Sequence, residues 1–313
     1  MRLLGAFLKL VRYPNLIYIF LTQYLLQYCV IVPVFGKFAL QPTLSNVQFF
    51  FLSLSTVMIA AAGYIINDYF DINIDLVNKP EKIVVDKLIS RRWAMVWHTV
   101  LNIGGVLTGF ILGWQVGYIL LGVTQLVCTG LLWFYSTSYK RQLLAGNVVI
   151  ALLTALTVMG VGFYEPRLYS GISRSTALPV LHLLRIILVY AAFAFTISMV
   201  REIIKDLEDM KGDSREGSHT MPVVWGVNAC KDISYVFLWF LVGAILFIQV
   251  KIAAWSWWLP IIYLLLFVQV PAIIVIRKLK KAITRAAFRQ TGNYVKLIML
   301  TGILSMIFFK FMW

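Results

Sequence analysis

The feature that most constrains the fold is a series of apolar runs, each long enough to cross a lipid bilayer. They lie at about residues 14–35, 48–66, 94–113, 117–135, 144–163, 178–200, 232–250, 254–276 and 294–313. A helix needs about 20 apolar residues to span the hydrocarbon core, and backbone polar groups in lipid are satisfied only inside helices or closed barrels. We therefore expect an all-α, polytopic membrane protein with about nine transmembrane helices in one bundle.

The composition agrees with this fold and limits the classes of function. Of the 313 residues, 61% are hydrophobic and only 13% are charged, whereas soluble domains are about half apolar and about a quarter charged. No polar stretch is long enough to build a separate soluble core. We therefore expect residues 1–313 to form a single transmembrane domain, with a retained first helix instead of a cleaved signal peptide.

The basic residues indicate how the chain is oriented in the membrane. Most of the 28 Lys and Arg fall on segments that share the side of the N-terminus. By the positive-inside rule, the N-terminus is expected in the cytoplasm and the C-terminus outside, in a bacterial or archaeal cell membrane. The net charge of +15 is then a signal of topology and of contact with anionic lipid, so nucleic acid is not an expected partner.

The carboxylates are concentrated in two clusters that share one spacing. Of the 13 Asp and Glu, all except Glu165 lie within residues 67–92 and 201–232. The shared members are Asn67, Asp68, Asp71 and Asp75 in the first cluster and Asp206, Asp209 and Asp213 in the second. On an α-helix, positions i, i+3 and i+7 project from one face. Both clusters follow apolar runs that end on the expected cytoplasmic side.

Carboxylates that share one helix face repel each other unless cations lie between them. Mg²⁺ prefers hard oxygen ligands, and one or two carboxylates combined with phosphate oxygens suit it. Two such stripes that face each other across a bundle would hold two Mg²⁺ with a diphosphate between them. The alternative is a pair of solvated acidic loops, but this does not account for the same spacing of both clusters on the same side.

A third signal, YSTSYKR, begins at Tyr135 at the cytoplasmic end of the fourth run. The Lys140 ammonium and the Tyr135 hydroxyl are both suited to phosphate oxygens. Taken alone, such a segment is more often an interfacial anchor. Lys82 and Lys205 add cations beside the two acidic clusters.

Together these segments resemble a known family. NDYFDINIDLVNKPEK resembles the NDxxDxxxD motif of the UbiA superfamily of intramembrane prenyltransferases, YSTSYKR resembles its YxxxK motif, and KDLEDMKGD resembles its second aspartate motif. The resemblance covers nearly the whole chain. Residues 201–226 look most like the archaeal-type digeranylgeranylglyceryl phosphate synthases and their bacterial relatives.

The resemblance implies a Mg²⁺-dependent transfer of a prenyl group from its diphosphate, most simply geranylgeranyl diphosphate, to the hydroxyl of a lipid glyceryl phosphate. It implies catalytic roles for Asp68, Asp71, Asp206, Asp209 and Lys140, with the four aspartates as metal ligands. It implies substrate-binding roles for Asn67, Asp75, Lys82, Tyr135, Lys205 and Asp213. This chain departs from the family pattern at Lys82-Ile83, where many members carry Arg-Pro.

Two alternatives remain open. An aromatic acceptor of the hydroxybenzoate or naphthoate type, as in quinone biosynthesis, is a close second because these motifs do not specify the acceptor. A cation transporter is the alternative outside enzymes, but transporter sites lie near the bilayer midplane, whereas these carboxylates are expected at helix ends. The candidate bases for the acceptor's proton are an aspartate of the second cluster and His98, His182 and His219, of which the first two histidines lie near helix ends and are expected to be structural.

Overall fold

The computed structural model describes residues 2–78, 80–168 and 177–312. Within these ranges the chain is almost entirely helical, and its one β contact is an isolated bridge between Val85 and Ile89. The expected all-α class is therefore confirmed. The chain divides into two compact units, Met1–Lys140 with Leu156–Leu188 (unit 1) and Arg141–Ala155 with Val189–Trp313 (unit 2).

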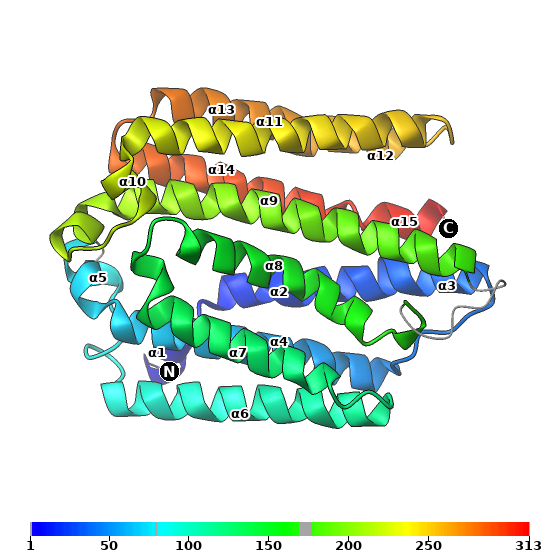
Figure 1. The fold of residues 1–313 in the computed structure, drawn as a ribbon, viewed down its shortest axis with the longest axis horizontal. Helices are drawn as coiled ribbons and strands as arrows, with labels where there is room; N and C mark the ends of the chain where they lie inside the picture. The colour runs from blue at the N-terminus through cyan, green and yellow to red at the C-terminus, as the bar shows by residue number, and fades with distance from the viewer. Residues whose placement is uncertain (1, 79, 169–176, 313) are drawn as a thin grey trace. The chain divides into compact units, whose positions relative to one another are not determined.

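Unit 1 is built on α4, α6 and α7, which pack side by side (Figure 1). Its elements are α1 (Arg2–Leu10), α2 (Tyr13–Leu25), a π-helical turn (Leu26–Ile31), α3 (Val32–Lys37), α4 (Asn46–Phe70), α5 (Ile72–Asn78), α6 (Arg91–Gln115) and α7 (Leu121–Thr137). Short 3₁₀ turns follow at Pro80–Lys82, Tyr139–Arg141 and Pro166–Leu168. The helices α8 (Ala145–Phe163) and α9 (Ala177–Arg215) each have one part in unit 1 and one in unit 2.

Unit 2 surrounds a core of buried apolar side chains from α8, α9, α11, α13 and α14. Its remaining elements are α10 (Met221–Val224), α11 (Gly226–Ala253), α12 (Trp258–Leu264), a π-helical turn (Leu265–Gln269), α13 (Val270–Lys281), α14 (Arg285–Leu304) and α15 (Ile307–Met312). Ile203, Leu238, Val275 and Val295 are almost fully buried in this core. Their burial holds the C-terminal half of α9, which carries the second acidic cluster, firmly in unit 2.

Eight helices of the described chain are long and apolar enough to cross a membrane. The remaining expected run is α7, whose 17 residues lie at the lower limit for spanning. It nevertheless contacts its two neighbours near both of its ends. Near its start, a Cβ on Gly122 would lie 2.4 Å from the ring of Phe110 in α6, and just beyond its end Lys140 contacts Asp71 at the end of α4. In the described chain, eight of the nine expected runs are therefore membrane-length helices, and the shorter helix α7 occupies the ninth.

Two boundaries differ from expectation. The first apolar run is preceded by a separate short helix, α1, because Arg12 adopts a left-handed backbone conformation (φ 51°) between α1 and α2. The sixth run was expected to end near residue 200, but α9 continues to Arg215 and is 39 residues long in total. At 1.5 Å per residue, α9 is about 58 Å long, which exceeds the hydrocarbon core. The second acidic cluster therefore stands on this helix and not after it.

Candidate active site

The first acidic cluster lies at a break between two helices. The helix α4 ends at Phe70, Asp71 has non-helical backbone angles (φ −93°, ψ 4°), and α5 begins at Ile72. The backbone N–H of Asp71 still donates to the carbonyl of Asn67, and that of Asp75 donates to the carbonyl of Asp71. The prediction that these carboxylates share one helix face required a continuous helix. That requirement is not met, because the helix is interrupted at Asp71.

Asp71 joins the first motif to the YxxxK segment. One of its carboxylate oxygens lies 2.6 Å from Lys140 Nζ, and the other accepts a hydrogen bond of 2.8 Å from the Asn67 side-chain amide. Lys140 stands on the 3₁₀ turn after α7, and only 8% of its side chain is exposed. The structure therefore brings together three residues that sequence reasoning had placed in one site, and it gives a buried ammonium a carboxylate partner.

Asp68 has a partner that sequence reasoning did not predict. The guanidinium of Arg12 donates to Asp68 at 2.6 Å and lies over the ring of Tyr64. The neighbouring carboxylate raises the pKa of Arg12, and burial acts in the opposite direction. A left-handed backbone at a residue other than glycine costs about 1–2 kcal/mol, so the contact with Asp68 helps to hold this conformation. In the sequence, the feature that could have pointed to Arg12 is its position directly before the first apolar run.

The other predicted residues of unit 1 lie near the same end. Tyr135 is buried in the last turn of α7, and Asp75 is partly buried on α5. Asn67 is 6% exposed, and within the described part of the chain no donor reaches its buried Oδ1 atom. The side chain of Lys82 lies outside the described residues, so the structure places only its backbone, in the turn Pro80–Lys82.

The second cluster forms the continuous stripe that its spacing predicts, because Asp206, Asp209 and Asp213 all stand on α9. Asp206 accepts a hydrogen bond of 2.7 Å from the side-chain amide of Asn147 on α8. Sequence reasoning missed Asn147, which is 5% exposed. The signal was its position inside an apolar run, where polar residues are costly and generally have a partner.

Asp213 has a partner in the loop that follows α9. It is 8% exposed, and its carboxylate accepts a hydrogen bond from the hydroxyl of Thr220 at 3.2 Å. Its carbonyl also accepts the backbone N–H of Ser218. These contacts fold the chain back toward α9. The neighbouring candidate base, His219, is exposed, and its backbone N–H donates to the carbonyl of Arg141.

The cations of unit 2 contact other carboxylates on α9 as well. Lys205 lies 3.4 Å from Glu202, which is 4% exposed and which also contacts Arg201. Glu202 was not predicted, although its charge in a helix of this hydropathy was a signal. From α14, Arg285 lies 3.7 Å from Asp209, and Arg289 lies 3.7 Å from Glu208.

Comparison with known proteins places these motifs in a family. The family model described as the UbiA prenyltransferase family matches residues 30–297. The chain belongs to the UbiA prenyltransferase family. With its membrane-length helices, it is therefore an integral membrane protein. The family assignment agrees with the resemblance drawn from the three motifs.

Individual relatives and structures agree with this assignment. The chain is 34% identical to the digeranylgeranylglyceryl phosphate synthase of Methanothermobacter thermautotrophicus over 183 residues, which are 58% of each protein. The matches span 55–65% of the length of four such synthases. The fold is similar to that of a UbiA homologue from Aeropyrum pernix K1 in its apo form, with a TM-score of 0.68, 13% identity and coverage of 93% and 97% of the two chains.

A second solved structure is the UbiA homologue from Archaeoglobus fulgidus bound to DMAPP and Mg²⁺. Its TM-score to this chain is 0.59, with 17% identity and coverage of 96% of this chain and 98% of that one. At 17% identity, this similarity concerns the fold alone.

No group of three or more acidic, histidine or cysteine side chains gathers around a metal position within the described residues. Most carboxylates of the first cluster instead contact cations of the protein itself. The donor set still suits Mg²⁺, which needs only one or two carboxylates when phosphate oxygens complete its octahedron. The buried Oδ1 atom of Asn67, which has no donor within the described chain, is a hard oxygen of the same kind. The residues present therefore fit the metal.

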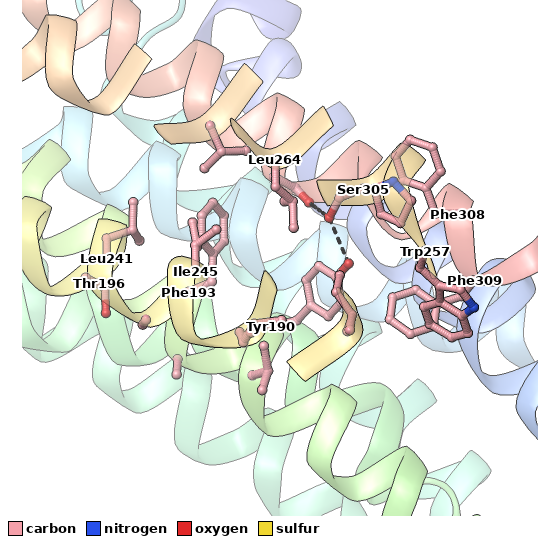
Figure 2. A pocket seen from close by; sticks show the side chains of 18 of the residues that line it. Tyr190, Phe193, Thr196, Leu241, Ile245, Trp257, Leu264, Ser305, Phe308 and Phe309 are labelled. Carbon is pink, nitrogen blue, oxygen red and sulfur yellow. Dashed lines mark hydrogen bonds between the residues drawn. The ribbon is translucent and has the colours of Figure 1, made fainter. Parts of the chain in front are cut away.

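An apolar pocket of about 230 Å³ lies within unit 2, between α9, α11, α12 and the C-terminal helices (Figure 2). None of its lining residues is charged. Its main polar feature is the hydrogen bond of 2.8 Å between the hydroxyls of Tyr190 and Ser305, which partner each other. Apolar cavities of this kind exclude water, so the pocket suits a hydrocarbon and not a polar ligand. Sequence reasoning did not predict it.

Proposed function

We propose that this protein catalyses the Mg²⁺-dependent transfer of a prenyl group, most simply geranylgeranyl, from its diphosphate to the hydroxyl of a lipid glyceryl phosphate. The observation that carries the proposal is the contact of Asp71 with both Asn67 and Lys140. A buried ammonium beside hard oxygen ligands matches a metal diphosphate, which needs both. The names of the synthases that the chain resembles support the acceptor class.

In this proposal, Asp68 and Asp71 bind Mg²⁺ in the first cluster, and Asp206 and Asp209 bind it in the second. Bound Mg²⁺ supplies charge neutralisation for the leaving diphosphate. Lys140 exchanges its contact with Asp71 for a phosphate oxygen, and Tyr135, Asn67, Asp75, Lys82, Lys205 and Asp213 complete the binding of substrate. Asn147 orients Asp206 through its hydrogen bond.

The reaction breaks the bond between the allylic C1 carbon and the diphosphate oxygen, and the bonding electron pair leaves with the diphosphate. The acceptor's hydroxyl oxygen then forms an ether bond to C1, and its proton passes to an aspartate of the second cluster or to His219. The developing positive charge on the allylic carbon reacts with water, so the site must be dry. Membrane-spanning helices and apolar space of the kind found in unit 2 provide such surroundings.

We further propose that the N-terminus lies in the cytoplasm and the C-terminus outside, in an archaeal or bacterial cell membrane. The bias of Lys and Arg and the nine apolar runs of the sequence support this orientation. Single cysteines placed at Ser138 and at Met312 in a background without native cysteines would be labelled from opposite sides of sealed vesicles. Labelling of both from one side would overturn the orientation.

The reaction is tested with purified protein, labelled geranylgeranyl diphosphate and three acceptors: geranylgeranylglyceryl phosphate, its dephosphorylated form and hydroxybenzoate. We expect product with the first acceptor, little with the other two, and none after EDTA until Mg²⁺ is restored. A clear preference for hydroxybenzoate would overturn the acceptor class but keep prenyl transfer. Full turnover in EDTA would overturn the metal-dependent mechanism itself.

A further inference from the structure

Two arginines of unit 2 face acidic residues on α9 without binding them tightly. Arg285 Nη2 lies 3.7 Å from Asp209 Oδ1, and Arg289 Nε lies 3.7 Å from Glu208 Oε1. Both distances exceed the range of a charge-assisted hydrogen bond. Within the described part of the chain neither guanidinium makes a hydrogen bond, and both side chains are nearly half exposed. Their donors therefore remain available to a ligand.

Three other arginines that lie beside carboxylates differ in this respect. Arg12, Arg91 and Arg201 each lie 2.5 or 2.6 Å from a carboxylate oxygen. These three are committed to partners inside the protein, and Arg285 and Arg289 are not. A guanidinium that is held near an acidic cluster without forming a hydrogen bond to it is suited to bind an anionic ligand.

The two arginines are held in place by the packing of α14. They stand four residues apart, so their side chains leave the same face of the helix. The start of the helix is fixed by the Thr284 hydroxyl, which accepts the N–H of Ala287. Between the arginines, Phe288 is 3% exposed and belongs to the core of unit 2. One turn further on, a Cβ on Gly292 would lie 3.7 Å from Ile204, so α14 closely approaches α9.

The depth of the two arginines suits a lipid headgroup. Arg285 begins a membrane-length segment that continues to Met312, so it stands where such a segment meets the polar interface. A phosphate monoester offers planar pairs of oxygens to a guanidinium fork, which binds them through two parallel hydrogen bonds. Lysine would supply only a point charge at the same position.

We propose that Arg285 and Arg289 form a clamp for the phosphate of the lipid acceptor. This inference rests on the proposed function and deepens it, because it names the residues that distinguish a glyceryl phosphate from an acceptor without phosphate. Arg285 then lies between the bound phosphate and Asp209, and its charge reduces the repulsion between the two anions. The donor diphosphate is bound by other residues and does not depend on the clamp.

The test compares Arg285→Gln, Arg289→Gln and the double variant with wild type in discs of neutral phosphatidylcholine. Each single change removes a charge-assisted contact, so we expect the KM for geranylgeranylglyceryl phosphate to rise about tenfold. The KM for geranylgeranyl diphosphate should stay within about twofold. The preference for the phosphorylated over the dephosphorylated acceptor should fall in the Gln variants. Arg285→Lys should keep more of this preference than Arg285→Gln but less than wild type. Arg277→Gln, which removes an exposed arginine of α13, is the matched control.

Each other outcome is decisive. If the KM of donor and acceptor rise together, or if Arg277→Gln acts like the double variant, the clamp is refuted. If the double variant loses affinity for vesicles of phosphatidylglycerol while its acceptor KM is unchanged, the arginines bind bulk lipid headgroups and the clamp is again refuted. If wild type forms no product, equilibrium binding of labelled geranylgeranylglyceryl phosphate decides. Loss of that binding in the double variant alone would keep the clamp and overturn the reaction.

Discussion

The two acidic clusters share one spacing of aspartates but differ in local structure and in partners. In the first, the helix breaks at Asp71, and protein cations lie 2.6 Å from both Asp68 and Asp71. In the second, the helix is continuous, Asp206 is bound by a neutral amide, and the arginine near Asp209 lies 3.7 Å away. Equal spacing therefore does not imply equal electrostatics. Asp68 and Asp71 of the first cluster contact cations of the protein, whereas Asp206 of the second cluster is bound by an uncharged amide.

The largest expected effect is a difference in stability between a variant of the first cluster and a variant of the second. Asp71→Ala should abolish turnover and lower the free energy of unfolding by about 3 kcal/mol, because it removes the carboxylate that lies 2.6 Å from the buried Lys140 ammonium. Asp209→Ala should also abolish turnover but cost less than about 1 kcal/mol of stability, since the opposing Arg285 stays half exposed. Denaturation in mixed micelles measures the difference. The control Asp71→Ala with Lys140→Met should recover stability without activity, and equal losses in the two single variants would contradict the contrast.

The next effect tests whether Lys140 serves the substrate or only the protein. If it binds the diphosphate, Lys140→Ala should reduce kcat/KM about 100-fold, because the cation acts where charge develops. The neighbouring Arg141→Ala, which removes an exposed cation, is the control and should change little. Steady-state kinetics with varied prenyl diphosphate measure both variants. Wild-type kinetics in Lys140→Ala would return this residue to the role of an interfacial anchor.

A smaller effect is expected at the amide that orients Asp206. Asn147→Ala removes a hydrogen bond of 2.7 Å to a carboxylate, which should cost about 1.5–3 kcal/mol in transition-state stabilisation. We expect kcat to fall and KM to change less, because Asp206 remains present but is no longer held in position. Asn147→Gln should restore part of the activity. A variant that loses stability but keeps the wild-type kcat would show that Asn147 serves folding alone.

The smallest effect is expected in the loop after α9. Thr220→Val removes the hydroxyl that donates to Asp213 at 3.2 Å, which should cost about 1 kcal/mol of stability. Thr220→Ser keeps the hydroxyl and should behave like wild type. Thermal unfolding measures the stability, and the KM for prenyl diphosphate reports on Asp213. A rise in KM without a stability change would indicate that Thr220 positions Asp213 for substrate.

The sequence by itself determined the helical membrane fold, because apolar run length and the need to satisfy backbone polar groups in lipid leave few choices. It also indicated the candidate site residues, since charged side chains are costly in so apolar a chain and are kept mainly where they serve a site. The extent of α9 and the separate helix α1 were not legible, because the polar residues at these junctions fit a loop and a helix equally well.

Only the tertiary structure decided which charges meet. Arg12 lies 56 residues from Asp68, and Asn147 lies 59 residues from Asp206, so no local pattern could predict these pairs. The break at Asp71 likewise belongs to the packed protein, where its carboxylate contacts Lys140 beyond the end of another helix. Spacing along the chain fixes which side chains share a helix face. Packing between helices fixes the partner that each of them contacts.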